Sequence, residues 1–132
     1  RLAAAGRFIA GLRRAAARGD TLYGECGGYM VLGRALADGA GQTHAMAGLV
    51  PLETSFASRL QLGYRVARLL EDGPLGCRGE RFRGHEFHYA ATVSAKGQAL
   101  FALADASGAD LGESGLRQGS VAGSFIHLID RA

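Results

Sequence analysis

The chain has 132 residues, of which 48% are hydrophobic and 20% are charged, and its formal net charge is +3. No run approaches the roughly 18 to 20 apolar residues that a membrane-spanning helix requires, so a membrane partner is excluded. The basic residues are scattered and are not interleaved with aromatic ones, which argues against a nucleic-acid partner. We expect one domain over residues 1–132.

Cysteine usage favours a reducing compartment. Cys26 and Cys77 are the only cysteines, and no secretory signal is recognisable. Two cysteines form neither a disulfide framework nor a four-ligand zinc site, so we expect a cytoplasmic protein without a metal site. The chain begins at Arg1, inside a helical pattern, which indicates that it was cut from a longer polypeptide.

The first part of the chain predicts a helix, a strand and a second helix. Apolar residues recur at three- and four-residue spacings from Leu2 to about Ala17, and Gly19 stands where a helix stops. Residues 21–23 form a short apolar run typical of a buried strand, and helical spacing returns over residues 29–36. This alternation is typical of an α/β fold.

The rest of the chain predicts mainly strands. Residues 38–41 are expected in a loop and residues 46–52 in a strand that ends at a proline. Two alternating runs, 62–70 and 82–93, flank a turn-rich segment and are expected to pair. A strand over 99–104, a glycine-rich loop over 107–119 and an apolar run over 121–129 complete the chain.

The segment Gly24-Glu25-Cys26-Gly27-Gly28 has the form G-x-C-x-G between the predicted strand and helix. This is the arrangement of a nucleophile elbow with Cys in place of Ser, in which glycines on both sides let strand and helix approach. The helix N-terminus favours the thiolate of Cys26, and the backbone N–H of Gly27 would face an oxyanion. The alternative is that Cys26 is a small buried hydrophobe in a turn.

A cysteine nucleophile needs a base, for which the histidines are candidates. His44 is expected to be solvent-exposed in a polar loop. His85 and His88 belong to RGHEFHY on an alternating strand, where they face opposite sides, which excludes the helical H-E-x-x-H zinc geometry. His127 follows a run of small and aromatic residues, and a structural histidine and a catalytic base fit it equally well.

Four motifs in this order, YGECGGYMVLG, LGYR, RGHEFHY and GSFIHL, resemble the C-terminal glutamine amidotransferase domain of the cobyrinic acid a,c-diamide synthases, which include hydrogenobyrinic acid a,c-diamide synthases. The resemblance runs from about Arg1 to Ile129. It implies a three-layer α/β domain with a mostly parallel central sheet, truncated at its N-terminus. It also implies that Cys26 attacks the glutamine amide and that His127 is the general base.

The resemblance implies a longer enzyme in which two domains carry out different steps of the reaction. Glutamine would be hydrolysed here, and the ammonia would pass to an N-terminal synthetase domain that amidates the a and c carboxylates of the corrinoid with ATP and Mg²⁺. This chain carries no G-x-x-x-x-G-K-[ST] loop, so we expect it to bind no cofactor and the synthetase domain to bind the ATP. The sequence leaves a homodimer open.

Two departures from the wider amidotransferase pattern stand out. The carboxylate that orients the histidine in many class I amidotransferases would be at position 129, which is isoleucine here. Cobyrinate-type enzymes resemble this chain in lacking it. The glycine-rich oxyanion loop and the first strand of the family would precede Arg1, and losing one oxyanion donor costs about 3 kcal/mol, so we expect this chain alone to be a weak glutaminase.

Substrate-binding roles are open for Glu86 and His88, near the glutamine pocket or a domain interface, and for Tyr64 and Arg65. A structural polar pair on a half-exposed strand explains Glu86 and His88 equally well. Two other functions stay open for the chain as a whole. One is an inactive binding module that keeps the fold, and the other is an amidotransferase for a related acid, as in cobyric acid synthesis.

Overall fold

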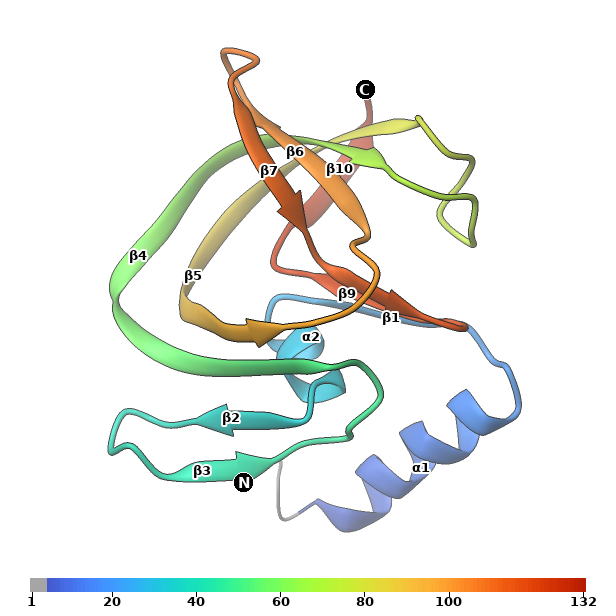
Figure 1. Cartoon of the computed structure of the whole chain (residues 1–132), viewed down its shortest axis with the longest axis vertical. Helices are drawn as coiled ribbons and strands as arrows, with labels where there is room; N and C mark the ends of the chain where they lie inside the picture. The colour runs from blue at the N-terminus through green and yellow to red at the C-terminus, as the bar shows by residue number, and fades with distance from the viewer. Residues whose placement is uncertain (1–4) are drawn as a thin grey trace.

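The computed structural model describes residues 5–132 as two helices and ten strands (Figure 1). The helices are α1 (Gly6–Ala17) and α2 (Gly27–Leu32). The strands are β1 (Leu22–Glu25), β2 (Ala35–Ala37), β3 (Thr43–Ala45), β4 (Leu52–Leu69), β5 (Arg81–Ala95), β6 (Phe101–Asp105), β7 (Asp110–Ser114), β8 (Leu116–Gln118), β9 (Val121–Ser124) and β10 (His127–Arg131).

The strands form two mixed sheets. One has three strands in the order β1-β9-β8, and the other has seven, in the order β10-β5-β4-β2-β3 with β6 beside β4 and β7 beside β6. Among the described residues, only β1 with β9 and β2 with β4 pair in parallel. The expected α/β character holds, but the described residues do not form the expected three layers around a mostly parallel central sheet. The reason is that the chain after α2 continues through hairpins, and hairpin neighbours pair antiparallel.

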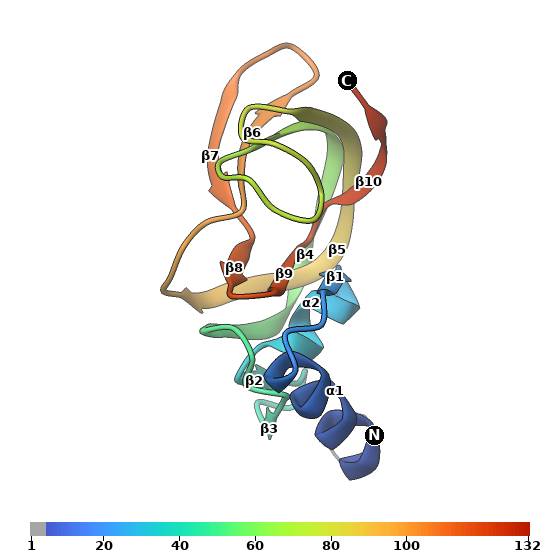
Figure 2. The ribbon, with the colours of Figure 1, turned by 90° about the vertical axis from the view of Figure 1, so that its right-hand side faces the viewer.

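The β4–β5 hairpin is the largest element of the fold, with strands of 18 and 15 residues. Its pairing is interrupted between Phe56 and Gln61, and such irregularities let a strand bend. Figures 1 and 2 show both strands strongly curved, with α2 and the three-stranded sheet at the open side of the curve. The curve brings the middle of β5 to the end of β1.

The buried apolar residues form two clusters. The first packs α2 against the start of β4 and against β8 and β9, and the second lies among β4, β5 and β6. Consecutive residues join the clusters, since Phe125 belongs to the first and Ile126 to the second. Burying a large apolar side chain contributes about 1.5–3 kcal/mol, so the short link from β9 to β10 is firmly anchored.

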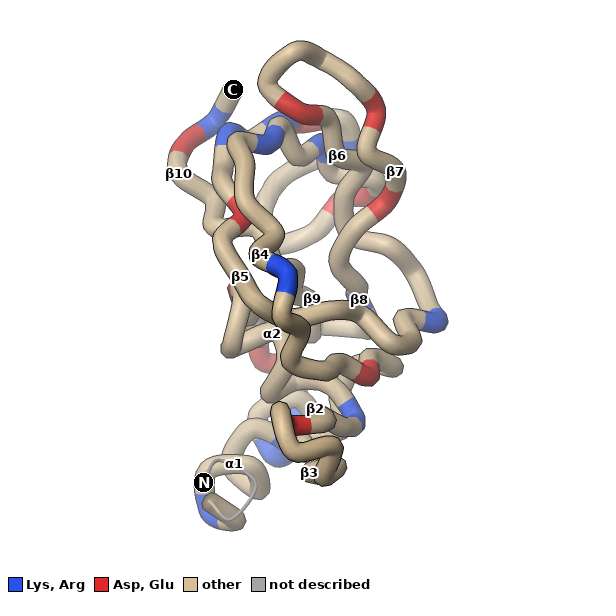
Figure 3. Tube along the Cα trace, turned by 90° about the vertical axis from the view of Figure 1, so that its left-hand side faces the viewer, with Lys and Arg blue, Asp and Glu red and all other residues tan. Residues whose placement is uncertain are grey.

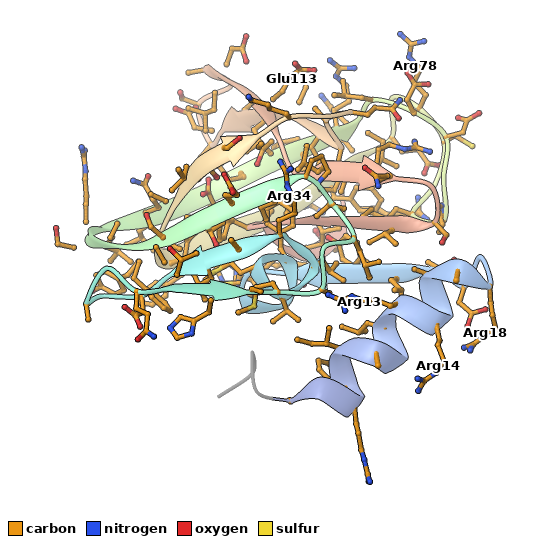
Figure 4. All side chains as sticks on the ribbon, turned by 60° about the horizontal axis from the view of Figure 1, so that its bottom comes forward. Arg13, Arg14, Arg18, Arg34, Arg78 and Glu113 are labelled. Atoms are coloured by element: carbon orange, nitrogen blue, oxygen red, sulfur yellow. The ribbon has the colours of Figure 1, made fainter. Side chains whose placement is uncertain are left out.

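Helix α1 begins and ends close to the predicted residues, although its predicted start at Leu2 lies outside the described part. Gly19 has a φ of 82°, and its N–H and that of Asp20 donate to the carbonyls of Ala16 and Ala15, which is the Schellman arrangement. Arg13 donates to the carbonyl of Ala47 at 2.8 Å and points toward the body of the molecule, whereas Arg14 points away from it (Figure 4). Gly19 therefore ends the helix as predicted.

The predicted strand over residues 46–52 is wrong before Leu52. The backbone N–H groups of Ala47, Gly48, Leu49 and Val50 donate instead to carbonyls at the end of α2, between residues 31 and 33. The last carbonyls of a helix lack partners within the helix, and this segment supplies them. Most of its apolar side chains are buried, as they would be in a strand, but its backbone N–H groups cap the end of α2.

Three other boundaries differ from the prediction. Helix α2 ends at Leu32, and Leu36 lies in β2. The predicted loop over 107–119 contains β7 and β8. The apolar run over 121–129 divides into β9 and β10, which belong to different sheets. The predicted pairing of the runs 62–70 and 82–93 is confirmed within the longer β4–β5 hairpin.

Charged residues are spread along the chain with both signs interspersed (Figure 3). Over the described residues, none of the helices is long and apolar enough to cross a membrane.

Candidate active site

Cys26 occupies a sharp turn between β1 and α2. Its φ of 54° is the only positive value at a non-glycine residue in the described part of the chain, and its ψ is −113°. These angles match the first central residue of a type II′ turn, a position that glycine normally takes. The N–H of Cys26 donates to the carbonyl of Ser124 at 2.9 Å, which ties the turn to the end of β9. The predicted elbow geometry is therefore present.

The two glycines that flank Cys26, Gly24 and Gly28, differ in how tightly they are packed. A Cβ atom on Gly24 would lie 2.7 Å from the backbone carbon of Gly28, so only glycine allows β1 to pack against the start of α2. A Cβ on Gly28 would meet nothing within 4 Å. The close approach of strand and helix thus depends on Gly24, the glycine before Cys26. At Gly28, the glycine after Cys26, a side chain would not collide, and the prediction that it would is wrong.

A pocket of about 720 Å³ opens beside Cys26. Its walls come from α2, from the β2–β3 hairpin and from β4 and β5. They contain Cys26, Gly27, Met30, Val31, Leu36, Asp38, His44, Met46, Phe56, His88, Tyr89 and Ala90. The sulfur of Cys26 also lies 4.0 Å from the carbonyl oxygen of Phe87, so the middle of β5 is directly beside it. Such a pocket admits a small polar molecule to the thiol.

Arg65, Glu86 and His88 form a hydrogen-bonded chain that reaches the wall of this pocket at His88. Arg65 Nε donates to Glu86 Oε1 at 2.7 Å, and His88 Nε2 lies 2.8 Å from Glu86 Oε2. The hydrogen bond from His88 holds the pKa of Glu86 below its ordinary value, and Arg65 adds to this effect against the cost of burial. The side chains of Arg65, Glu86 and His88 are only 14%, 16% and 7% exposed.

Both ring nitrogens of His88 lie within hydrogen-bond distance of an oxygen. Its Nδ1 lies 2.9 Å from the carbonyl oxygen of Ala90, while its Nε2 faces the ionised Glu86. The ring also stacks on Phe125 at a centroid distance of 4.2 Å. Of the three side chains in this hydrogen-bonded chain, only His88 is among the residues that line the pocket, and Glu86 and Arg65 lie behind it.

His127 is the first residue of β10, three positions beyond the serine that binds the Cys26 N–H. Its ring stacks on that of His85, with centroids 5.0 Å apart and planes 20° apart. It does not line the pocket, and no hydrogen bond joins it to Cys26 within residues 5–132. The fold brings the nucleophile and base candidates to neighbouring strand ends, and their catalytic roles stay predictions.

Tyr64 is the predicted site residue that the structure separates from the others. It pairs with His85 along the β4–β5 ladder, but its side chain is 71% exposed and lies outside the pocket. Its neighbour Arg65 points the other way, to Glu86. The alternation of a strand explains the difference, because successive side chains face opposite sides.

Sequence reasoning missed the Asp38–His44 pair at the pocket and the hydrogen bonds of Glu25, the residue before Cys26. His44, expected in solvent, lies in β3 with its Nε2 2.8 Å from Asp38 Oδ2, and this bond lowers the pKa of Asp38. Glu25 accepts hydrogen bonds from the Tyr23 hydroxyl and from the N–H of Leu128, both at 3.0 Å. Glu25 stands inside the G-x-C-x-G motif, which was the available signal.

No cluster of three or more His, Cys, Asp or Glu side chains that could hold a metal ion occurs in the described part of the chain. Cys26 shares its pocket with His44 and His88, and the backbone N–H of Gly27 follows it in the chain. This arrangement suits attack of a thiolate on a carbonyl carbon.

Residues 2–131 match the CobB/CobQ-like glutamine amidotransferase domain family, and the chain belongs to this family. It is 60% identical over 132 residues to the hydrogenobyrinate a,c-diamide synthase of Brucella anthropi, a match that covers 98% of this chain and 30% of that protein. The enzymes of the same name from Mesorhizobium japonicum and Rhodobacter capsulatus are 53% and 52% identical over 134 and 130 residues. These matches cover 100% and 98% of this chain and 30% of each relative. The chain therefore spans about 30% of the length of the curated relatives it matches.

Proposed function

We propose that this chain is the glutamine-hydrolysing part of an enzyme that amidates the a and c carboxylates of hydrogenobyrinic or cobyrinic acid. The observation that carries the proposal is the strained backbone of Cys26, with a φ of 54°, beside a pocket of about 720 Å³. A non-glycine residue keeps such a conformation only where the surrounding structure holds it, and such positions cluster at active sites. The family membership and the names of the relatives support the same reaction.

The proposed chemistry begins with the Cys26 thiolate, which attacks the carbonyl carbon of the glutamine side-chain amide. The N–H of Gly27 donates to the oxygen that becomes negative, and His127, which has taken the proton of the Cys26 thiol, passes it to the departing ammonia. Water then cleaves the thioester, which releases glutamate and the free thiol. Each step uses groups of this chain and requires no metal.

The Arg65–Glu86–His88 chain takes a supporting role in this proposal. Both ring nitrogens of His88 already face protein oxygens, those of Ala90 and Glu86, so the ring is held in a fixed position in the pocket wall. Glu86 and Arg65 hold that ring in place from behind, and Tyr64 has no part in the pocket.

The second half of the proposed reaction belongs to the rest of the polypeptide. The relatives are more than three times as long as this chain, which supports a synthetase domain preceding it. We assign ATP, Mg²⁺ and the corrinoid to that domain, which would activate each carboxylate for attack by ammonia. Glutamine is the only substrate that we assign to the residues described above.

The test compares nitrogen donors in the complete polypeptide. Amidation of hydrogenobyrinic and cobyrinic acids with ATP and Mg²⁺ is measured with glutamine or with ammonium, for the wild type, Cys26→Ser and the control Cys77→Ser. Cys77 is the matched control because it is a free cysteine exposed in the β4–β5 connection. We expect Cys26→Ser to lose the glutamine-dependent product, to keep the ammonium-dependent product, and Cys77→Ser to keep both.

Glutamine-dependent product from Cys26→Ser at the wild-type rate would mean that the elbow is structural. No glutamine hydrolysis in the wild type would favour a binding module. Product from another carboxylic acid, with none from either corrinoid, would mean that the synthetase serves a different substrate.

A further inference from the structure

His127 lies where the chain passes from one sheet to the other. Strand β9 pairs with β1 in the three-stranded sheet and ends at Ser124, and β10 begins at His127 and pairs with β5 in the seven-stranded sheet. Only Phe125 and Ile126 separate the two strands, and they are 6% and 0% exposed. The position of His127 is therefore set by how this crossing is held.

Two side chains hold the backbone on either side of His127. Ser124 Oγ accepts the N–H of Ile126 at 3.0 Å, and Glu25 Oε2 accepts the N–H of Leu128 at 3.0 Å. Ser124 and Glu25 are themselves partners in the parallel ladder of β9 with β1. The residues before and after His127 are thus both bonded to one rung of that ladder.

The carboxylate of Glu25 is fixed by a second donor. The hydroxyl of Tyr23, two residues earlier on β1, donates to the same oxygen at 3.0 Å. Burial, together with the charge of Glu25, raises the pKa of Tyr23 far above its ordinary value. Tyr23 therefore keeps its proton at neutral pH and remains a donor to Glu25.

The ring of His127 is supported from β5. The stacked ring of His85 fixes its plane, and Gly84 makes room for its backbone, because a Cβ on Gly84 would lie 2.5 Å from the His127 carbonyl oxygen. Ile129, at the position where many amidotransferases have a carboxylate, is 62% exposed and contributes no polar group. The support of His127 comes from its backbone and from ring stacking.

We propose that Glu25 is the positioning residue for His127, and that its hydrogen bond to the Leu128 N–H, with the stacked His85 ring, replaces a carboxylate bound to the imidazole. Glu25 directly precedes Cys26, so one side chain sets the relative position of nucleophile and base. The inference rests on the proposed glutaminase reaction. Glu25 acts through His127 and touches neither glutamine nor the reacting atoms.

The experiment measures kcat and KM for glutamine hydrolysis by the complete polypeptide in four variants. Glu25→Leu removes the acceptor, Glu25→Asp keeps the charge but is one methylene too short to reach Leu128, and Glu25→Gln keeps an oxygen at the same reach. The control is Glu113→Leu, which replaces a carboxylate exposed on β7, far from α1 in Figure 4. A misplacement of about 1 Å costs up to about a hundredfold in rate.

We expect kcat to fall about a hundredfold in Glu25→Leu and at least tenfold in Glu25→Asp, with KM within about threefold of the wild type. Glu25→Gln should recover kcat to within several-fold, and Glu113→Leu should match the wild type. Iodoacetamide labelling of Cys26 should survive in Glu25→Asp, which shows that the elbow is intact.

A wild-type kcat in Glu25→Asp, or equal losses in Glu25→Gln and Glu25→Leu, overturns the inference. If Glu25→Leu does not fold, the Asp and Gln pair decides the question by itself. Failure of the proposed function is seen separately, because the wild type would then hydrolyse no glutamine or Cys26→Ser would remain active.

Discussion

Replacing Cys26 by glycine is expected to stabilise the folded chain while it removes the thiol. The φ of 54° at this position strains any residue that carries a Cβ, and glycine adopts it freely. The informative comparison is between Cys26→Gly and Cys26→Ala, because both variants lose the sulfur and only the alanine keeps the strain.

The expected difference follows from two opposing effects. Holding a non-glycine residue in a sparsely populated region costs about 1–3 kcal/mol. Glycine loses about 0.5–1 kcal/mol to the greater freedom of its unfolded chain. The net gain of Cys26→Gly over Cys26→Ala is therefore about 1 kcal/mol, equivalent to a rise of about 3–5 °C in Tm for a domain of this size.

Urea denaturation of the two variants measures this difference directly. Ala122→Gly is the control, because Ala122 lies on β9 with an ordinary φ and should lose about 0.5–1 kcal/mol. The reasoning is refuted if Cys26→Gly is no more stable than Cys26→Ala, since the turn would then store no strain at Cys26.

Three further predictions concern the same region. Gly24→Ala should destabilise the chain by about 2 kcal/mol in urea denaturation because its Cβ meets backbone, whereas Gly28→Ala should change the free energy of unfolding by less than about 1 kcal/mol. The lowered pKa of Glu86 contributes stability above its unfolded value of about 4.3, and this contribution is lost as the pH falls through the lower folded value. The stability advantage of the wild type over Glu86→Gln should thus shrink on acidification below about pH 4, and an advantage independent of pH would contradict this origin. Iodoacetamide at pH 7 should label Cys26 faster than the more exposed Cys77, as mass spectrometry of the digested protein can measure, and preferential labelling of Cys77 would argue against an activated thiol.

Local patterns predicted the elements whose causes are local. Gly19 ends α1 because a glycine there adopts a positive φ, and this depends only on neighbouring carbonyls. The elbow at Cys26 follows from a five-residue motif. The β4–β5 pairing follows from two alternating runs separated by a turn-rich segment.

Long-range contacts decided the elements that the sequence could not predict. An apolar run such as residues 46–52 is compatible with a strand, but its N–H groups are taken by the end of α2. Residues 121–129 form one apolar run in the sequence, yet Phe125 and Ile126 pack into different clusters and divide the run between two sheets. Burial could be predicted in both cases, whereas the hydrogen-bond partner could not.

The site was predictable to the extent that its residues stand in motifs. Cys26, Gly27 and His88 were named from the sequence and line one pocket, and Glu86 and Arg65, also named, are hydrogen-bonded in series to His88. The Asp38–His44 pair comes from a hairpin that the sequence did not reveal, because His44 was expected in a loop.

The relative position of Cys26 and His127 depends on the parallel ladder between β1 and β9. Cys26 follows the last residue of β1, and His127 is three residues beyond the last residue of β9. The last rung of the ladder, Glu25 with Ser124, supplies both side chains that bond to the backbone around His127. Cys26 and His127, 101 positions apart in the sequence, are therefore held by four pairs of residues in the ladder and by two short links that are bonded back to it. Because the ladder is regular structure, small movements of the surrounding loops should leave the spacing of Cys26 and His127 unchanged.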